Sequence, residues 1–285
     1  IKKRLEQIGN QSEQPAKLGD VVFEEPVKKK GLEFDVETEV GEEGWEKIKK
    51  QYEWCCNDEL SNAWEESILA HQLKILFPDR VEELNLEEYW EKMKAHYESE
   101  CEQEEWWGAT NQAMHLKILF PDRMGELDLD RYWEKMKGQY DRNCKEGMWG
   151  DAARQAMQLK IVFPERIAEL NLENSWEKMK EHYEDYLEEG TWGGVIGDSV
   201  DFKILFPEKV DELGLENVWG ELKKYCEQKD REDDEGYKLA ELSTFLKILS
   251  AKEVKITNQG LELIMEDEED FEDRIPDIQE RLNYE

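Results

Sequence analysis

The chain has 285 residues, with 38 Lys and Arg against 71 Asp and Glu, so its formal net charge is −33 at neutral pH. Such a charge repels the phosphates of nucleic acids and of anionic lipids, which makes both poor partners, and it attracts proteins with a basic surface. Eleven Trp, ten Tyr and nine Phe argue against a disordered chain, because so many aromatic side chains are enough to build a core.

Residues 1–40 precede a regular repeat and contain Pro15, Pro26 and three consecutive lysines from Lys28. Two interpretations stay open for this N-terminal arm or linker: an extended arm that packs on the first repeat, or a flexible tether. The chain shows no signal-like apolar segment and no run of 18 apolar residues. We therefore expect no membrane insertion and a cytoplasmic location.

A repeat occupies residues 41–250. The segment from Leu116 to Pro121 occurs four times nearly unchanged, and its lysine returns every 43 or 44 residues, at Lys74, Lys117, Lys160, Lys203 and Lys247. One helix of each unit is expected to open at Trp45, Trp90, Trp133, Trp176 and Trp219, and the other at Trp64, Trp107, Trp149, Trp192 and Tyr237. A fixed period in this range indicates stacked units, so the sequence predicts an all-α fold, an α-solenoid of about five two-helix repeats.

The second unit shows how each repeat folds locally. Its first helix is predicted from Leu86 to Ser99, with the apolar face Trp90, Met93, Tyr97 and Cys101 at helical spacing. Asn85 stands where a helix N-cap is expected. The second helix is predicted from Glu105 to Phe120 and is apolar on more than one side, so it should lie inside the stack.

The joints between units carry two further signals. Pro121 is expected to end the second helix, because its ring clashes with the preceding turn and it has no N–H to donate. A leucine recurs in each joint, at Leu84, Leu127, Leu170 and Leu213, and is expected to fill it. Five units with helices about 8–10 Å apart predict an elongated body roughly 50 Å long.

The C-terminal region departs from the repeat. The fifth unit has lost the helix-opening tryptophan and the phenylalanine, as a terminal unit often does. Residues 251–265 alternate apolar and polar, which predicts a β-hairpin cap over the open end of the stack. Its inward residues are expected to be Val254, Ile256, Leu261 and Leu263. Residues 266–285 open with an acidic run and are expected to form a solvated acidic tail.

These segments carry a resemblance. Two helices per unit with Trp, Tyr and Pro at fixed places resemble, loosely, the tetratricopeptide class of α-solenoid. The segment from Leu116 to Pro121, and the ending from Ala251 to Leu263, resemble more closely a set of uncharacterised acidic α-helical repeat proteins of candidate-phyla (Patescibacteria-type) bacteria. The resemblance covers most of residues 42–265. It implies a bacterial repeat protein and brings no activity with it.

The cysteines are expected to be structural. Cys56, Cys101 and Cys144 each follow the unit's first tryptophan by eleven residues, where the fourth unit has Leu187. Leucine can replace a buried thiol but not a metal-binding or nucleophilic thiolate, so these three are expected in the core. Cys226 takes the place of a repeated tyrosine and is expected to pack as well. Cys55 lies off the pattern and is expected to be an exposed or half-exposed free thiol.

No catalytic constellation is visible. The histidines His71, His96, His115 and His182 do not occur with the spacing of metal ligands. Nucleophile elbow, phosphate loop, dinucleotide fingerprint and EF-hand patterns are missing from the sequence. The glycines around Gly193 are expected to let two helices approach closely. We therefore predict no catalytic, cofactor-binding or metal-binding residue, and no cofactor.

Two rows of lysine recur in the repeats. The first consists of Lys74, Lys117, Lys160, Lys203 and Lys247, and the second of Lys49, Lys94, Lys137, Lys180 and Lys223. The rows are expected either to line a face for an acidic ligand or, preferably, to pack their stems on apolar surface while the ammonium groups meet nearby acids.

Three functions remain open at this point. The first is a non-catalytic protein-binding scaffold, or a peripheral subunit of a larger assembly, that uses an elongated acidic solenoid surface and binds a protein with a basic surface. The second is an acidic mimic or chaperone-like cap of a basic nucleic-acid-binding surface. The third and least favoured is an enzyme with an unrecognised site in a groove. Ionic strength distinguishes the first two functions, because binding by charge mimicry weakens steeply as salt rises whereas binding through an apolar contact does not.

Overall fold

The computed structural model describes residues 40–57, 63–232, 237–257 and 260–265. Five helical hairpins follow one another, which confirms the all-α prediction of five two-helix repeats. They are α3 (Gly41–Asn57) with α4 (Ala63–Leu76), α5 (Trp90–Glu102) with α6 (Trp106–Leu119), α7 (Leu129–Glu146) with α8 (Trp149–Val162), α9 (Trp176–Glu189) with α10 (Trp192–Leu205), and α11 (Leu215–Glu232) with α12 (Tyr237–Ser250). The acidic tail, and the N-terminal arm except for Val40, lie outside the described residues.

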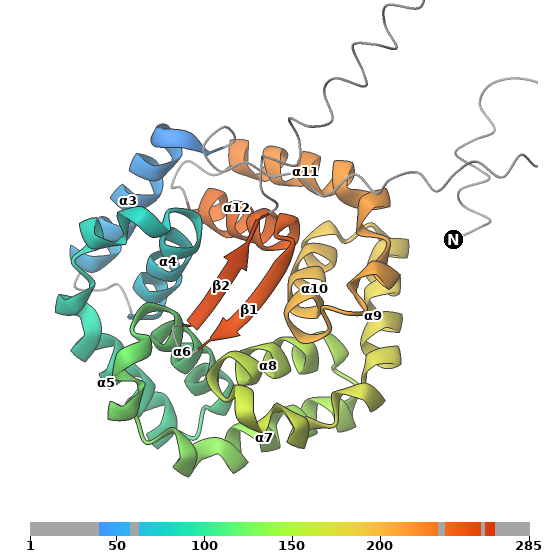
Figure 1. The fold of residues 1–285 in the computed structure, drawn as a ribbon, viewed down its shortest axis with the longest axis horizontal. Coiled ribbons are helices and arrows are strands. Elements are labelled where there is room, and N and C mark those ends of the chain that lie inside the picture. Colours follow the sequence, from blue (N-terminus) through green and yellow to red (C-terminus); the bar gives the residue numbers. More distant parts are fainter. Residues whose placement is uncertain (1–39, 58–62, 233–236, 258–259, 266–285) are drawn as a thin grey trace, which may run out of the picture.

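The hairpins close into a ring. The second helix of each hairpin lies inside and the first lies outside (Figure 1). Each inner helix packs on the next one along the chain, and the last, α12, packs on α4 and α3 of the first hairpin. The expectation of an elongated body was therefore wrong, because the small rotation between repeats brings the fifth unit back to the first. In the part of the chain that the structure describes, the first and last hairpins therefore cover each other's apolar faces.

Each hairpin is held by an aromatic pair that unites two of the repeated sequence markers. Trp90 of α5 is fully buried and meets Phe120, the residue before the proline, edge to face with ring centroids 5.1 Å apart. The guanidinium of Arg123 lies over the other side of the indole, 4.2 Å from its centroid, and is paired with Glu126 at 2.7 Å. Equivalent Trp–Phe pairs occur in the three other complete units, Trp45–Phe77, Trp133–Phe163 and Trp176–Phe206.

The first lysine row joins one inner helix to the next. Lys74 Nζ on α4 donates to the carbonyl oxygen of Ile118 on α6 at 2.6 Å, and Lys160 on α8 donates to Ile204 on α10 at 2.7 Å. Lys247 on α12 donates to Leu76 at 2.9 Å and so crosses the seam between the last and first hairpins. These carbonyls end helices and lack an intrahelical partner, so the ammonium groups cap them.

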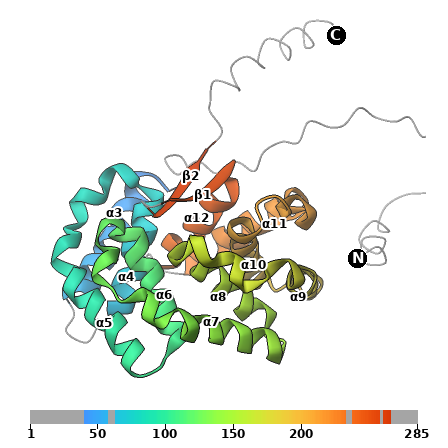
Figure 2. The ribbon, with the colours of Figure 1, turned by 60° about the horizontal axis from the view of Figure 1, so that its bottom comes forward.

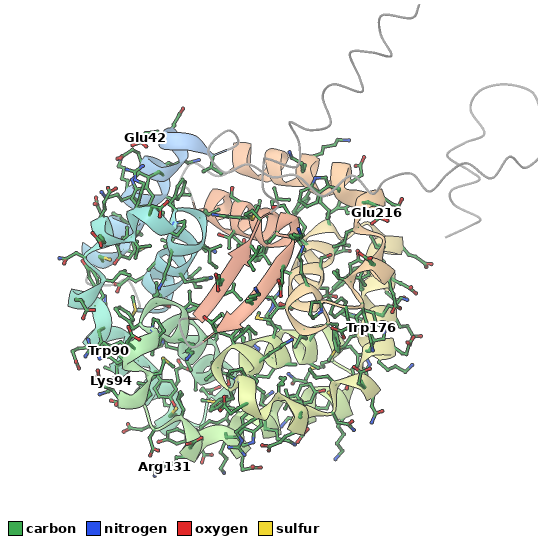
Figure 3. All side chains as sticks on the ribbon, in the orientation of Figure 1. Glu42, Trp90, Lys94, Arg131, Trp176 and Glu216 are labelled. Atoms are coloured by element: carbon green, nitrogen blue, oxygen red, sulfur yellow. The ribbon has the colours of Figure 1, made fainter. Side chains whose placement is uncertain are left out.

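The preferred expectation that these ammonium groups meet acids was wrong for Lys74, Lys160, Lys203 and Lys247, because they donate to backbone carbonyls. In the second row, four lysines do meet acids, as preferred. The pairs are Lys49–Glu83, Lys94–Glu98, Lys137–Asp141 and Lys180–Glu212. Charged side chains project from the outer helices around the ring (Figure 3).

The joints between hairpins are short 3₁₀ segments: η2 (Pro78–Leu84), η3 (Leu86–Tyr89), η4 (Pro121–Glu126), η5 (Pro164–Leu170), η6 (Leu172–Asn174) and η7 (Val210–Leu213). Pro121 follows the end of α6 as expected, and the four joint leucines are all buried. Asn85 is not an N-cap. Its φ of 51° places it in the left-handed region between η2 and η3, and its side chain makes no cap hydrogen bond. Asparagine tolerates that conformation better than most residues do.

The β-hairpin covers one mouth of the ring. Strands β1 (Glu253–Thr257) and β2 (Gly260–Ile264) pair antiparallel, with Val254 opposite Leu263 and Ile256 opposite Leu261. These four side chains pack against the core, as expected. The strands contact α10 and α6, and a side chain at Gly260 would lie 3.2 Å from the carbonyl of Lys117 (Figure 2). The hairpin therefore caps the ring's centre, where the inner helices end, and the expectation that it covers the open end of a stack was wrong.

Candidate binding face at one mouth of the ring

The ring has two different faces. The hairpin face carries β1 and β2 over the C-terminal ends of the inner helices. The opposite side, here called the loop face, consists of the last turns of the outer helices, the first turns of the inner helices and the links between them. Three of these links fall at residues 103–105, 147–148 and 190–191. Where the structure describes the link, in the second, third and fourth hairpins, side chains reach the loop face from equivalent positions.

Exposed apolar side chains gather on the loop face. Within the described residues, four large hydrophobic side chains are exposed, and three of them belong to this face. Trp54 in the last turn of α3 is 56% exposed, Trp107 in the first turn of α6 is 38% exposed, and Met148 just before α8 is 38% exposed. The fourth, Met265, follows β2 on the hairpin face.

Exposed acidic side chains lie close in the sequence to two of these apolar ones, Trp107 and Met148. Residues 102–105 are exposed and contribute Glu102, Glu104 and Glu105, and Glu146 and Asp151 flank Met148. Glu188 and Glu189 end α9 on the same side. The loop face therefore combines exposed apolar side chains with dense negative charge.

The interior of the ring is polar near the loop face. A ladder of side-chain hydrogen bonds connects α4 to α6 and α6 to α8. Ser67 Oγ on α4 donates to Gln112 Oε1 on α6 at 3.1 Å and lies 2.9 Å from His115 Nδ1. One unit on, Gln155 Nε2 on α8 donates to Thr110 Oγ1 at 2.9 Å, and Gln158 Nε2 donates to Asn111 Oδ1 at 2.8 Å.

The ladder changes between α8 and α10. Asp198 and Asp201 of α10 occupy the places of Gln155 and Gln158, 43 residues later. Asp201 meets Arg154, with Nε 3.7 Å from Oδ2. The repeat alignment places Ala153 where the earlier rung has Thr110, so the hydroxyl that accepts from Gln155 has no counterpart for Asp198. Both carboxyls are at least 95% buried, and each has an Oδ2 without a hydrogen-bond partner in the structure.

Burial dominates the electrostatics of these two carboxyls. It raises the pKa of Asp198 to about 7 and that of Asp201 to about 6, because desolvation penalises the charged form. Arg154 opposes both shifts. Its side chain is 46% exposed, whereas that of Asp201 is 3% exposed, so Arg154 is the solvent-accessible member of this ion pair.

Glycines on α8 and α10 make room for larger side chains in this sector. A Cβ at Gly197 would lie 2.8 Å from an Arg154 nitrogen, and one at Gly194 would lie 2.5 Å from the ring of Tyr186. A Cβ at Gly150 would lie 2.8 Å from His182 Nε2 and 3.7 Å from Asp198 Oδ1. The expectation that such glycines let helices approach closely was wrong, because the atoms that fill the space belong to side chains.

The cysteines are structural, with one correction. Cys101 is buried, and Cys56, Cys144 and Leu187 are partly buried against the core, as the shared repeat position predicted. Cys55 is 2% exposed and part of the core, contrary to the expected exposure. Burial raises the pKa of the Cys56 and Cys101 thiols to about 11, which makes both poor nucleophiles. Cys226 lies outside the described side chains.

Two histidines come together through stacking of the units. The His71 and His115 rings are stacked with centroids 4.5 Å apart, and burial lowers the pKa of both. Among the described residues, no group of three His, Cys, Asp or Glu side chains is placed to hold a metal ion. Nor does any helix in that part of the chain have the length and apolar character needed to cross a membrane.

The Arg154–Asp198–Asp201 cluster was missed by sequence reasoning. The available signal was a comparison of repeats at equal positions, where Asn111 becomes Arg154 and then Gly197, and Gln155 becomes Asp198. Such substitutions keep the repeat period while changing charge. Comparison with protein-family models, with curated proteins and with solved structures finds no match to this chain.

Proposed function

We propose that this protein is a non-catalytic binding scaffold, or a peripheral subunit of a larger assembly, that binds a basic protein through its loop face. One observation carries the proposal: three of the four exposed large hydrophobic side chains in the described residues lie on this face, among acids. Apolar contacts at the centre of an interface supply affinity, and complementary charge around them supplies association rate and specificity.

The repeated residues hold the ring together, which leaves the loop face for binding. The Trp–Phe pairs, the lysine caps and the cysteines all have structural partners inside the ring. The loop face differs from unit to unit. Because α6 begins at Trp106 and not at Trp107 as expected, Trp107 is equivalent to Gly150 and Gly193 in the next two units. A scaffold that keeps its frame constant and varies one face is expected to use that face for recognition.

The test compares two faces of the same ring. We expect wild-type protein, used as bait in an extract of its source cells, to retain a basic partner that a Trp107→Ala/Met148→Ser variant loses at least tenfold. Met265→Ser is the matched control, because Met265 is 37% exposed and Met148 38%, on opposite faces. Quantitative mass spectrometry of the retained protein measures the effect.

Two outcomes would contradict this proposal. Equal retention by the loop-face variant and by Met265→Ser would mean that the apolar residues of the loop face are not used. A partner lost completely between 50 and about 300 mM salt would indicate charge mimicry in place of an apolar interface.

A further inference from the structure

The contact between α8 and α10 differs in chemistry from the contact before it in the ring. We call Arg154 of α8, together with Asp198 and Asp201 of α10, the α8–α10 rung. In the preceding contact, Gln155 and Gln158 of α8 stand at the places of the two aspartates, and their amides donate hydrogen bonds to α6. Two neutral amides are thus replaced by two carboxyls at a buried junction between repeats.

Protonation decides whether these carboxyls can act as the amides do. A protonated carboxyl has an O–H donor and an acceptor, like an amide, whereas an ionised carboxylate only accepts. Asp198 and Asp201 are at most 4% exposed, and among the described residues the Oδ2 atom of each has no hydrogen-bond partner. A carboxylate that is buried and short of donors is costly, so its ionised form gains by reaching water.

The rung also brings like charges together when both carboxyls ionise. Asp198 and Asp201 are three residues apart on α10, so they are neighbours on one helix face. Arg154 Nε lies 3.7 Å from Asp201 Oδ2, beyond hydrogen-bonding distance, and the Arg154 side chain is 46% exposed. Solvent therefore screens its attraction, which offsets only part of the cost of ionisation.

The elements packed against α10 carry few other groups that act on the two carboxyls. Among the described residues, those that interact electrostatically with Asp198, besides Asp201 and Arg154, are Asp151 of α8 and Tyr183 and Tyr186 of α9. The remaining elements carry groups with other contacts: Tyr225 of α11 near Gly193, Glu241 of α12 acting on Arg154, Asp211 of η7 acting on Lys203, and Glu253 paired with Lys255 on β1. His182 of α9 approaches Gly150, as Asp198 does, so its own titration needs a control.

We propose that the α8–α10 rung is a proton-operated joint in the ring. With its carboxyls protonated, α8 and α10 stay packed, and with both ionised the two helices separate locally and let water reach the carboxylates. Because both helices begin at the loop face, opening changes the spacing of the third and fourth hairpins there. The joint belongs to the ring itself and does not depend on the proposed binding of a partner.

The direction of the effect follows from the cost of burial. Burial raises the pKa of Asp198 to about 7 and that of Asp201 to about 6 in the packed ring, whereas the pKa of a hydrated aspartate is about 4. The stability that the bound protons give to the packed state is fully present below about pH 4 and is lost as the pH rises through 7. Asp198 alone favours opening by roughly tenfold per pH unit up to about pH 7, and the effect levels off above that.

Amide hydrogen exchange of the full chain measures this opening, because a helix amide exchanges only while its hydrogen bond is broken. Protection factors, corrected for the intrinsic pH dependence of exchange, are compared at about pH 5.5 and about pH 8. We expect protection in α8 and α10 to fall at least tenfold at the higher pH. Protection in α4 and α6 should not fall, because the buried His71 and His115 have lowered pKa values and act with the opposite sign.

Four variants assign the titrating groups. Asp198→Asn/Asp201→Asn keeps both side-chain shapes without their charges and should abolish the fall. Glu184→Gln/Asp185→Asn removes two charges at exposed positions of α9 and should leave the fall unchanged. His182→Gln removes the nearby imidazole and should also leave it unchanged. Thermal melts at about pH 5.5 establish that each variant is folded, and Asp198→Asn alone, with a fall reduced at least threefold, serves if the double aspartate variant does not fold.

Equal protection of α8 and α10 at the two pH values would overturn the inference. A fall of the same size in α4 and α6 would overturn it too, because it would indicate that the whole fold is destabilised. A fall that persists in Asp198→Asn/Asp201→Asn, or that disappears in His182→Gln, would contradict the assignment to the two carboxyls.

Discussion

Replacing Trp133 with alanine is expected to lower the free energy of unfolding by about 3–5 kcal/mol, as removal of a large aromatic from a core does. Trp133 is fully buried and meets the Phe163 ring edge to face at 5.0 Å. Its Nε1 donates to Glu169 at 3.1 Å, and Arg166 lies 4.4 Å over its ring. The substitution therefore opens a cavity and removes the indole ring against which Phe163 and Arg166 pack at the joint between two hairpins.

Chemical denaturation measures this loss. Trp107→Ala is the control, because the same side chain at a 38% exposed position of the loop face has little packing to lose. We expect it to change the free energy of unfolding by less than about 1 kcal/mol, as most surface substitutions do. Similar losses for Trp133→Ala and Trp107→Ala would contradict the distinction between the buried repeat frame and the exposed loop face.

Replacing Asp198 with asparagine is expected to stabilise the protein at pH 8 and to have little effect near pH 4. Burial raises the pKa of Asp198 to about 7 in the fold, so the folded protein keeps a proton that the unfolded chain loses near pH 4. Stability from this group is present below about pH 4 and is lost as the pH rises through 7. One pKa unit corresponds to about 1.4 kcal/mol, so the gain at pH 8 reaches as much as about 4 kcal/mol.

The difference between variant and wild type isolates this effect. The groups that interact electrostatically with Asp198 are Asp201 on its own helix, Asp151 and Arg154 on α8, and Tyr183 and Tyr186 on α9, and all remain in the variant. The buried His71 acts with the opposite sign: its pKa is lowered to about 4, so its contribution grows as the pH rises toward 6.5. That contribution cancels in the comparison.

Urea denaturation of both proteins between pH 4 and 8 supplies the measurement. A difference in unfolding free energy that stays flat across this range would mean that Asp198 is ionised in the fold like an exposed aspartate. Stabilisation near pH 4 as large as at pH 8 would assign the effect to packing and not to the buried charge.

Local pattern was sufficient to predict the repeat itself. Trp90, Met93 and Tyr97 share one helix face, and Pro121 ends the inner helix. Both features could be predicted because each depends only on residues within one or two turns. The inward face of the β-hairpin followed from alternation in the same way. These features are local, and a single sequence contains them in full.

Closure of the ring could not be read from the sequence. It depends on the small rotation from one hairpin to the next, which sums over five units before α12 meets α4. The lysine caps were missed for the same reason: Lys74 and Ile118 are 44 residues apart, and the acceptor is a backbone carbonyl that no residue type reveals. Cys55 was placed outside the core because the repeat frame gave its position no equivalent, yet its neighbours bury it.

The break in the hydrogen-bond ladder between α8 and α10 could be predicted only in part. Asp198 and Arg154 are visible as charged residues inside apolar runs, and the repeat alignment identifies the residues they replace. Their partners are not visible, because Asp201 reaches Arg154 only when α8 and α10 lie side by side. The residues of the candidate site could thus be suspected individually, and the structure was needed to bring them together.

Ring closure is tested most directly by spin-label distances between equivalent positions of different repeats. Labels on noncanonical amino acids leave the five native cysteines in place. The sites are Glu46, Glu91 and Glu134, all more than 60% exposed, and Gly220, where an added side chain meets nothing within 4 Å. A closed ring predicts that the Glu46–Gly220 separation matches that of the neighbours Glu46–Glu91 and is shorter than Glu46–Glu134. A Glu46–Gly220 separation that is the longest of the three would show an open solenoid and contradict the account.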